Sequence, residues 1–183
     1  PFCYFQGCIS LTNITIPLSV TTISYSFYDC MSLTKITIPS SVTKIGDYSF
    51  FNCSSLTKIE IPSSVTEIGY SAFYGCTSLT QIAIPSSITN IKRFCFHGCK
   101  SLVQISIPSS VTRIEDYAFY DCSSLSYLLI PNSVEVIRNY SFDRCSSLQQ
   151  IIIPSSVRRI GSGCFSCCTS LIQVAILPGL SII

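Results

Sequence analysis

Charged side chains are scarce in this chain of 183 residues. Only 11% of the residues are charged, against about a quarter in a typical globular domain. Lysine and arginine together number 11 and aspartate and glutamate 9, which leaves a formal net charge of +2. So small a charge creates no strong field for a polyelectrolyte. We therefore expect no nucleic-acid partner.

Histidine is nearly absent, which restricts the enzymatic chemistry available to the chain. His97 is the only histidine, so any Ser-His-Asp or Cys-His site would have to use it. Tyr74 and Tyr120 stand 23 residues to either side of it, so we expect an exposed aromatic position rather than a catalytic base. No Gly-rich phosphate loop, HExxH motif or EF-hand spacing occurs. The sequence predicts no catalytic residues, no cofactor, no metal site and no enzyme.

Long apolar runs are also missing, although 48% of the residues are hydrophobic. No run approaches the roughly 18 residues that a membrane-spanning helix needs, so we expect no transmembrane segment. The apolar residues are instead distributed evenly along the chain. Such a distribution suits a protein that buries each short segment against the next.

A 23-residue unit of the form SLTKIxIPSSVTxIxxYxFxxC recurs through almost the whole chain. Internal repetition at this kind of period indicates a solenoid. We predict a single array over residues 1–183, of about eight units. The chain starts and stops inside a unit, so we expect it to be a fragment of a longer protein. The period is marked by Pro39, Pro62, Pro85, Pro108, Pro131 and Pro154, and by Cys30, Cys53, Cys76, Cys99, Cys122, Cys145 and Cys168.

Each unit shows a pattern of two short extended segments followed by a turn. Residues 58–61 alternate charged and isoleucine side chains, as in a strand with one buried face. Pro62 ends this strand because proline cannot donate to a ladder. Residues 65–68 form a second extended segment. Phe73 and Cys76 stand three positions apart, which predicts one helical or 3₁₀ turn.

These units resemble the BspA-like, or Treponema pallidum-type, leucine-rich repeats. The pattern of that family runs close to LxxIxIPxSVxxIGxxAFxxCxS, and the chain reproduces it from about Ser10 to Ile176, with one unit a residue short between Ser24 and Phe27. The resemblance implies a right-handed leucine-rich repeat solenoid with a parallel concave β-sheet of short strands and helical or 3₁₀ turns on the convex side. It also implies a non-catalytic adhesion or recognition protein of bacteria or protist parasites, with a host or extracellular-matrix protein among the conceivable partners.

The twelve cysteines allow more than one interpretation. Seven share one repeating position and would all point into the core, where restrictive disulfide geometry makes pairing difficult and free cysteine behaves as a small hydrophobe. Cys164, Cys167 and Cys168 form a separate CxxCC cluster that could be free, oxidised or metal-bound, although structural zinc needs four ligands. Free thiols favour a reducing interior such as the cytoplasm, whereas the family resemblance implies the cell surface or secretion.

Serine repeats at two positions of the unit, and we expect both columns to satisfy backbone groups at the turns. A direct role in ligand contact is the alternative. The two columns are Ser41, Ser64, Ser87, Ser110, Ser133 and Ser156, and Ser32, Ser55, Ser78, Ser101, Ser124, Ser147 and Ser170.

Recognition is expected at the outward positions of the concave sheet, because the core columns leave only these free to vary. Tyr127, Leu129 and Ile152 would form an exposed apolar patch there, of a kind that often marks an interaction site. Drift of the repeat sequence, or contact with further repeats or a partner copy, would explain the same residues. The alternative function is a structural spacer or self-associating segment. The candidate partner-binding residues are Lys58, Glu60, Gln81, Gln104, Tyr127, Leu129, Gln150 and Ile152.

A run of basic residues near the second extended segment is the other candidate surface. Arg113, Arg138, Arg158 and Arg159 would lie on neighbouring coils and could meet an acidic surface or a sulfated glycan. The competing interpretation is a solvated edge, since arginine commonly keeps its head group in water.

Overall fold

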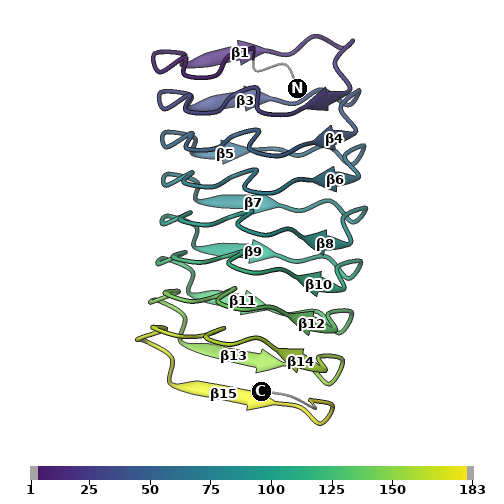
Figure 1. The fold of residues 1–183 in the computed structure, drawn as a ribbon, viewed down its shortest axis with the longest axis vertical. Coiled ribbons are helices and arrows are strands. Elements are labelled where there is room, and N and C mark those ends of the chain that lie inside the picture. Colours follow the sequence, from purple (N-terminus) through teal and green to yellow (C-terminus); the bar gives the residue numbers. More distant parts are fainter. Residues whose placement is uncertain (1–3, 181–183) are drawn as a thin grey trace.

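The computed structural model describes residues 4–180 and folds them into a parallel β-solenoid (Figure 1). Each coil runs through a first strand, a second strand and a returning turn before it enters the next coil. The coils stack along one axis, so residues 22 or 23 positions apart lie side by side. The predicted solenoid with a parallel sheet of short strands is therefore confirmed.

The first strands of successive coils form the first sheet. Parallel pairing joins β1 to β3, β5 through β7 and β9 to β11, and β13 to β15, and a bridge between Thr37 and Glu60 links β3 to β5. The strands are β1 (Asn13–Thr15), β3 (Lys35–Thr37), β5 (Lys58–Ile59), β7 (Gln81–Ala83), β9 (Gln104–Ser106), β11 (Tyr127–Leu129), β13 (Gln150–Ile153) and β15 (Gln173–Ile176).

The second strands of the coils form the second sheet, on another side of the solenoid (Figure 1). It consists of two parallel groups, β2-β4-β6 and β8-β10-β12-β14. These strands are β2 (Thr22–Ile23), β4 (Lys44–Ile45), β6 (Glu67–Ile68), β8 (Asn90–Ile91), β10 (Arg113–Ile114), β12 (Val136–Ile137) and β14 (Arg159–Ile160).

The core consists of stacked columns of identical or similar side chains. Leu56, Val65 and Phe73 have no solvent exposure, and the same holds for most of their equivalents in the inner coils. The phenylalanine rings lie nearly parallel, with centroids 5.5 Å apart between Phe50 and Phe73 and again between Phe73 and Phe96. Since each ring needs one ring above and one below, a single coil could not bury its own apolar face.

The returning turn contains no helix among residues 4–180, so the predicted helical or 3₁₀ turn is wrong. Its backbone bonds to the next coil instead of to itself along a helix. The N–H groups of Tyr48 and Phe50 donate to the carbonyls of Tyr70 and Ala72 at 2.9 and 2.8 Å. The three-residue spacing of Phe73 and Cys76 reflects a tight turn. This turn is closed by a hydrogen bond from the Cys76 N–H to the Phe73 carbonyl.

Two left-handed residues in each turn exclude a right-handed helix. In one coil these are Tyr48 and Asn52, with φ of 53° and 58°. The position of Asn52 is rich in Asp, Asn and Gly, which tolerate this conformation. The position of Tyr48 is mostly aromatic, and bulky residues rarely adopt it. The Tyr48 ring packs at a tilt against the Tyr25 ring, with centroids 5.2 Å apart, and this contact together with the bonds between coils holds it in place.

Serine hydroxyls form a ladder between coils, as predicted for the first serine column. Each hydroxyl donates to a backbone carbonyl of the preceding coil, at 2.6–2.8 Å for five of the six. For the second predicted column the expectation fails. The hydroxyl donors there are the residues one position earlier, such as Ser54 and Thr77, which bond to Met31 and Ser54. The first ladder runs from Ser41, Ser64, Ser87, Ser110, Ser133 and Ser156 to the carbonyls of Val20, Val42, Val65, Ile88, Val111 and Val134.

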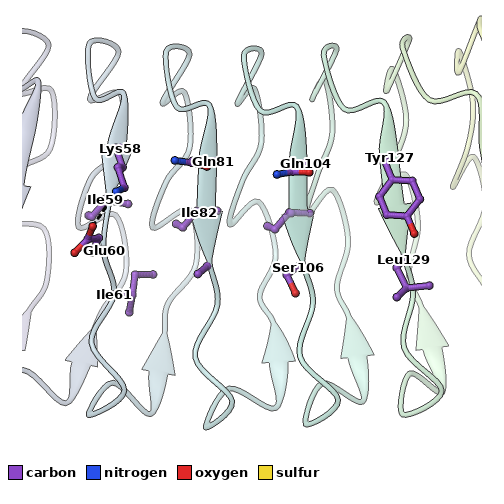
Figure 2. A pocket seen from close by; sticks show the side chains of 12 residues that line it. Lys58, Ile59, Glu60, Ile61, Gln81, Ile82, Gln104, Ser106, Tyr127 and Leu129 are labelled. Atoms are coloured by element: carbon purple, nitrogen blue, oxygen red, sulfur yellow. Dashed lines mark ion pairs between the residues drawn. The ribbon is translucent and has the colours of Figure 1, made fainter.

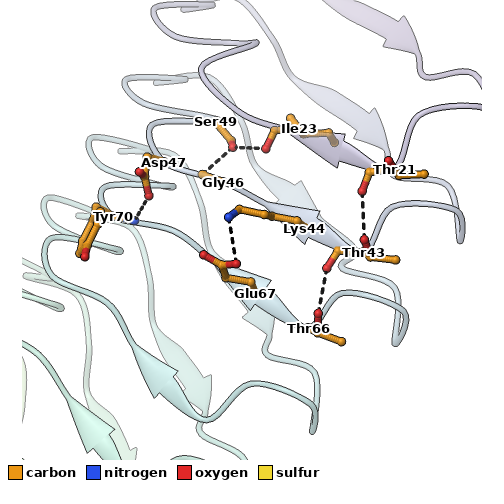
Figure 3. A network of polar contacts seen from close by, with 10 residues as sticks. All are labelled: Thr21, Ile23, Thr43, Lys44, Gly46, Asp47, Ser49, Thr66, Glu67 and Tyr70. Atoms are coloured by element: carbon orange, nitrogen blue, oxygen red, sulfur yellow. Dashed lines mark hydrogen bonds and ion pairs between the residues drawn. The ribbon is translucent and has the colours of Figure 1, made fainter. Parts of the chain in front are cut away.

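Figure 3 shows how densely such bonds connect three coils at the second sheet. Thr66 donates to the Thr43 carbonyl at 3.3 Å, and Thr43 donates likewise to Thr21. The carboxylate of Asp47 accepts the N–H of Tyr70 at 2.9 Å. Polar side chains at these inward and edge positions therefore hold the coils together and are not free for ligands.

The sequence predicts that one unit is a residue short between Ser24 and Phe27, and the structure places the missing residue next to Ser24. Ile23 pairs with Ile45, 22 positions later, while the ring of Tyr25 packs against that of Tyr48, 23 positions later. Ser24 therefore occupies the corner at which the next coil has both Gly46 and Asp47. The coil absorbs the deletion at this corner, so the strands on either side keep their pairing.

The serine ladder can be tested with two alanine variants. We expect Ser64→Ala to lower the free energy of unfolding by about 1 kcal/mol, because the Val42 carbonyl loses a partly buried hydrogen bond. Ser55→Ala is the matched control, since its hydroxyl makes no hydrogen bond within residues 4–180, and its effect should stay within about 0.5 kcal/mol. Urea unfolding followed by circular dichroism measures both. Equal effects of the two substitutions would contradict the assignment.

Candidate interaction surface

The outward side chains of the first sheet form two exposed columns. In each strand, the residues on either side of the central buried residue point to solvent, as the exposed-buried-exposed pattern of β7, β9 and β11 shows. The buried residues between them, Ile82, Ile105 and Leu128, are each 5% exposed. The residues predicted to be outward are therefore outward.

A groove of about 640 Å³ crosses the middle of this sheet, from β5 to β11 (Figure 2). Its hollow coincides with the small side chains of Ala83 and Ser106. The larger side chains of Glu60 on one side and Leu129 on the other rise above them in the same column. Gln81 and Gln104 lie side by side along the groove, where their amides can both donate and accept hydrogen bonds.

The groove continues toward the amino-terminal coils. A second hollow of about 630 Å³ covers β3 and β5 and shares Lys58, Glu60 and Ile61 with the first. Thr34, Lys35 and other polar residues line it. The two hollows therefore form one open surface that extends over five coils, from β3 to β11.

The charged end of the groove is an exposed ion pair. The Lys58 ammonium lies 2.9 Å from the Glu60 carboxylate. The hydrogen bond from Lys58, with its charge and that of Lys35, lowers the pKa of Glu60. Pairs this exposed contribute little to stability, so their charges remain available to a partner.

The opposite end is apolar. Tyr127, Leu129 and Ile152 are 55%, 59% and 54% exposed, and β11 and β13, which carry them, are neighbours. Val103, which precedes β9, and Ile172, which precedes β15, are exposed apolar residues as well. Contiguous exposed apolar area of this kind often marks an interaction site.

The structure places six of the eight candidate residues in the groove lining, namely Lys58, Glu60, Gln81, Gln104, Tyr127 and Leu129. Gln150 and Ile152 lie on β13, exposed but outside the lining. Ala83 and Ser106 were not among the candidates although they create the hollow. The signal was present in the sequence, since the column from Glu60 to Leu129 falls to small side chains at these two positions.

The cysteine column has a structural role beyond filling space. The Cys53 and Cys76 thiols donate to the carbonyls of Phe27 and Phe50 in the preceding coil, at 3.1 and 3.2 Å. The same bond recurs for the rest of the column, at Cys30, Cys99, Cys122, Cys145 and Cys168. All eleven cysteines within the described residues are free. Protonated thiols are poor nucleophiles and poor metal ligands.

The carboxy-terminal cysteine cluster is divided between core and surface. Cys164 and Cys168 are buried, and their thiols contact the Ser141 hydroxyl at 3.3 Å and the Phe142 carbonyl at 3.2 Å. Cys167 is exposed. Within residues 4–180, no group of three or more His, Cys, Asp or Glu side chains is arranged to hold a metal ion.

His97 lies inside a column of aromatic rings and is less exposed than the sequence predicts. Its ring stacks between Tyr74 and Tyr120, with centroid distances of 4.3 and 4.6 Å. Burial lowers its pKa, and its Nδ1 atom has no hydrogen-bond partner within residues 4–180. The charge of Asp121 acts against this lowering of the pKa, and that of Lys100 adds to it.

Comparison with known proteins identifies this repeat. The model of the BspA type leucine rich repeat region matches residues 2–103 and 66–183, with six copies. The comparison with curated proteins returned no match. The structure has no helix within residues 4–180 that is long and apolar enough to cross a membrane.

Several solved structures share the fold. A leucine-rich repeat protein from Eubacterium ventriosum is 33% identical, with a TM-score of 0.73 over 85% of this chain and 42% of its own. One from Bacteroides ovatus is 27% identical, with a TM-score of 0.71 over 97% of this chain and 64% of its own. A leucine rich cell surface protein from Faecalibacterium prausnitzii is 27% identical, with a TM-score of 0.58 over 94% and 61%. The chain thus spans about two fifths to two thirds of the length of these proteins.

Alkaline pH should destabilise the fold through the buried thiols. Burial raises the pKa of Cys30 and Cys168 to about 11 and of Cys76 and Cys164 to about 12, against about 8.5 in an unfolded chain. Above about pH 8.5 the thiols of the unfolded state lose protons that the buried thiols of the folded state keep. The free energy of unfolding should therefore be level below pH 8 and fall between about pH 8.5 and 11, by up to about 1.4 kcal/mol per pH unit and thiol.

Urea unfolding at pH 7 to 10.5 measures this loss, and thiolate absorbance supplies the control. The buried thiols of the folded protein should contribute little thiolate at pH 9.5, and urea should release their thiolate absorbance. Full thiolate absorbance in the folded protein at that pH would contradict the buried hydrogen-bonded column.

Proposed function

Because this chain belongs to the BspA-type leucine-rich repeat family, we propose that it is a non-catalytic protein-binding or adhesion module that acts through the first sheet. The observation that carries the proposal is the groove between β3 and β11. It combines a charged pair, adjacent amides and an aromatic and aliphatic end on one rigid surface. A partner that matches all three can be distinguished from one that matches only the apolar part.

The relatives support this assignment in general terms. They are leucine-rich repeat proteins of bacteria, and one is described as a cell surface protein. Exposure on a cell surface would give the groove access to host or extracellular-matrix proteins. Rigid pre-formed surfaces bind with a smaller entropic cost than flexible ones, which suits a solenoid whose coils are bonded to each other at every turn.

A self-associating or spacer segment is the second candidate, and one observation favours it. Ile172, Val174 and Ile176 on or beside β15 are 86%, 50% and 46% exposed, which is apolar surface that another copy could cover. Light scattering over a range of concentrations separates the candidates. Growth in mass with concentration supports the spacer, and a constant monomer mass supports the binding module.

The binding module can be tested with two surface variants against a panel of purified extracellular-matrix proteins by biolayer interferometry. Leu129→Glu combined with Ile152→Lys should weaken binding about tenfold or more, since it places charges on the apolar end. Ala83→Trp should weaken it as well, because the indole fills the hollow. Both changes lie at exposed positions, so the melting temperature should stay the same.

The matched control is Thr66→Glu with Thr112→Lys, two exposed positions beside the second sheet. It should leave binding to the panel unchanged. Wild-type binding that neither groove variant alters would refute the assignment of the groove, and absence of any binding in the panel would remove matrix proteins as the partner class.

A further inference from the structure

Three exposed arginines surround one half-buried valine on the second sheet. Arg113 in β10 pairs with Val136 in β12, which pairs with Arg159 in β14. The two arginines are therefore two strand spacings apart, or about 9.6 Å at their backbones. Arg138 follows Val136 by two residues and points to the same side, about 7 Å along the strand direction. We call Arg113, Arg138 and Arg159 the arginine triangle.

The position of Arg138 is fixed although it lies just beyond β12. Its N–H donates to the Ile114 carbonyl at 2.9 Å, which continues the parallel pairing of β10 and β12. Ile137 is fully buried and Arg138 is exposed, as strand alternation requires. All three arginines therefore stand on paired backbone and not on a mobile loop.

The charges of the triangle are not neutralised by the protein. Within residues 4–180, no carboxylate lies in ion-pair distance of Arg113, Arg138 or Arg159. The nearby acidic groups are engaged elsewhere. Glu115 pairs with Lys92 at 3.8 Å and accepts the N–H of Arg93, while Asp116 accepts the N–H of Asn139 at 3.2 Å.

Glu135, which precedes Val136, is the remaining acidic side chain beside the triangle. The strip of surface around Val136 therefore carries the three arginines of the triangle and this one further glutamate. The local excess of positive charge stands out in a chain whose formal net charge is only +2.

Guanidinium groups favour one class of ligand. Their planar forks bind sulfate, phosphate and carboxylate groups through two parallel hydrogen bonds. Three forks at fixed spacings fit a polymer that repeats its anionic groups along a line. The outward positions of the second-sheet strands carry no aromatic ring within residues 4–180, so stacking of nucleic-acid bases is not provided.

We propose that the arginine triangle binds a sulfated polysaccharide. The site is separate from the first-sheet groove, because it lies on the other sheet of the solenoid (Figure 1). One molecule can therefore hold a protein in the groove and an anionic glycan on the second sheet. The glycan contact would be electrostatic and sensitive to salt, unlike the mixed contact in the groove.

A labelled heparin oligosaccharide is the probe, and fluorescence anisotropy at several salt concentrations is the measurement. Wild-type protein should bind saturably, and the affinity should fall as salt rises. The triple variant Arg113→Gln, Arg138→Gln, Arg159→Gln should bind at least tenfold more weakly. Its salt dependence should become shallower by about one unit of log–log slope for each arginine that contacts an anion.

The control is Lys35→Gln, Lys44→Gln, Lys100→Gln, which removes the same charge elsewhere and should reduce affinity less than twofold. These lysines are exposed or in partly exposed ion pairs, so both triple variants should keep the wild-type melting temperature within a few degrees. The groove variant Leu129→Glu, Ile152→Lys should bind heparin like the wild type, which separates this site from the proposed function.

Three results would overturn the proposal. The first is that the wild-type protein does not bind heparin saturably. The second is that both triple variants lose the same amount of heparin affinity, which would mean that only the net charge of the protein matters. The third is binding of poly-L-glutamate as tightly as heparin, which would assign the triangle to an acidic protein surface. Neutral dextran should not bind.

Discussion

Every coil of this protein depends on its neighbours to satisfy its backbone hydrogen-bonding groups. Strands of two to four residues are too short to be stable alone. In the turn between Tyr48 and Asn52, the N–H groups of Tyr48, Phe50 and Asn52 donate to carbonyls of the next coil, and the Phe51 N–H donates to Tyr48 within the turn. Side chains donate hydrogen bonds to the carbonyls that no backbone N–H reaches. Serine hydroxyls and cysteine thiols donate to carbonyls of the preceding coil. An unpaired buried carbonyl is costly, so these residue types recur in every unit.

This constraint explains why so little of each unit is free to recognise a ligand. The inward residues fill the core, and most residues at the corners hold one coil to the next. Only the outward positions of the two sheets vary without disturbing the stack. The groove arises there because two adjacent coils carry Ala83 and Ser106 where their neighbours carry Glu60 and Leu129. The arginine triangle arises in the same way, by substitution at outward positions of β10 and β14 and beside β12.

The sequence predicts the features that are set within a single unit, and it does not predict those that depend on the adjacent coils. The positions of the strands, the core columns and the outward columns could be predicted because strand alternation and a fixed period act within a short stretch of sequence. The turn could not, since Phe73 and Cys76 at a spacing of three fit a helical turn as well as a tight one. Aromatic residues such as Tyr48 and Tyr117 also give no local sign of a left-handed backbone. Their conformation depends on rings and carbonyls in the adjacent coils.

The sequence by itself therefore determined the solenoid, its period and the faces of its strands, because these depend on which residues are apolar and how often they recur. Only the tertiary structure decided which hydroxyl in a pair such as Ser54 and Ser55 bonds to the preceding coil, how deeply His97 lies among its neighbours, and which candidate residues share one hollow. Each of these depends on atoms one coil away, whose direction and distance are set when the coils stack and cannot be read from a single unit.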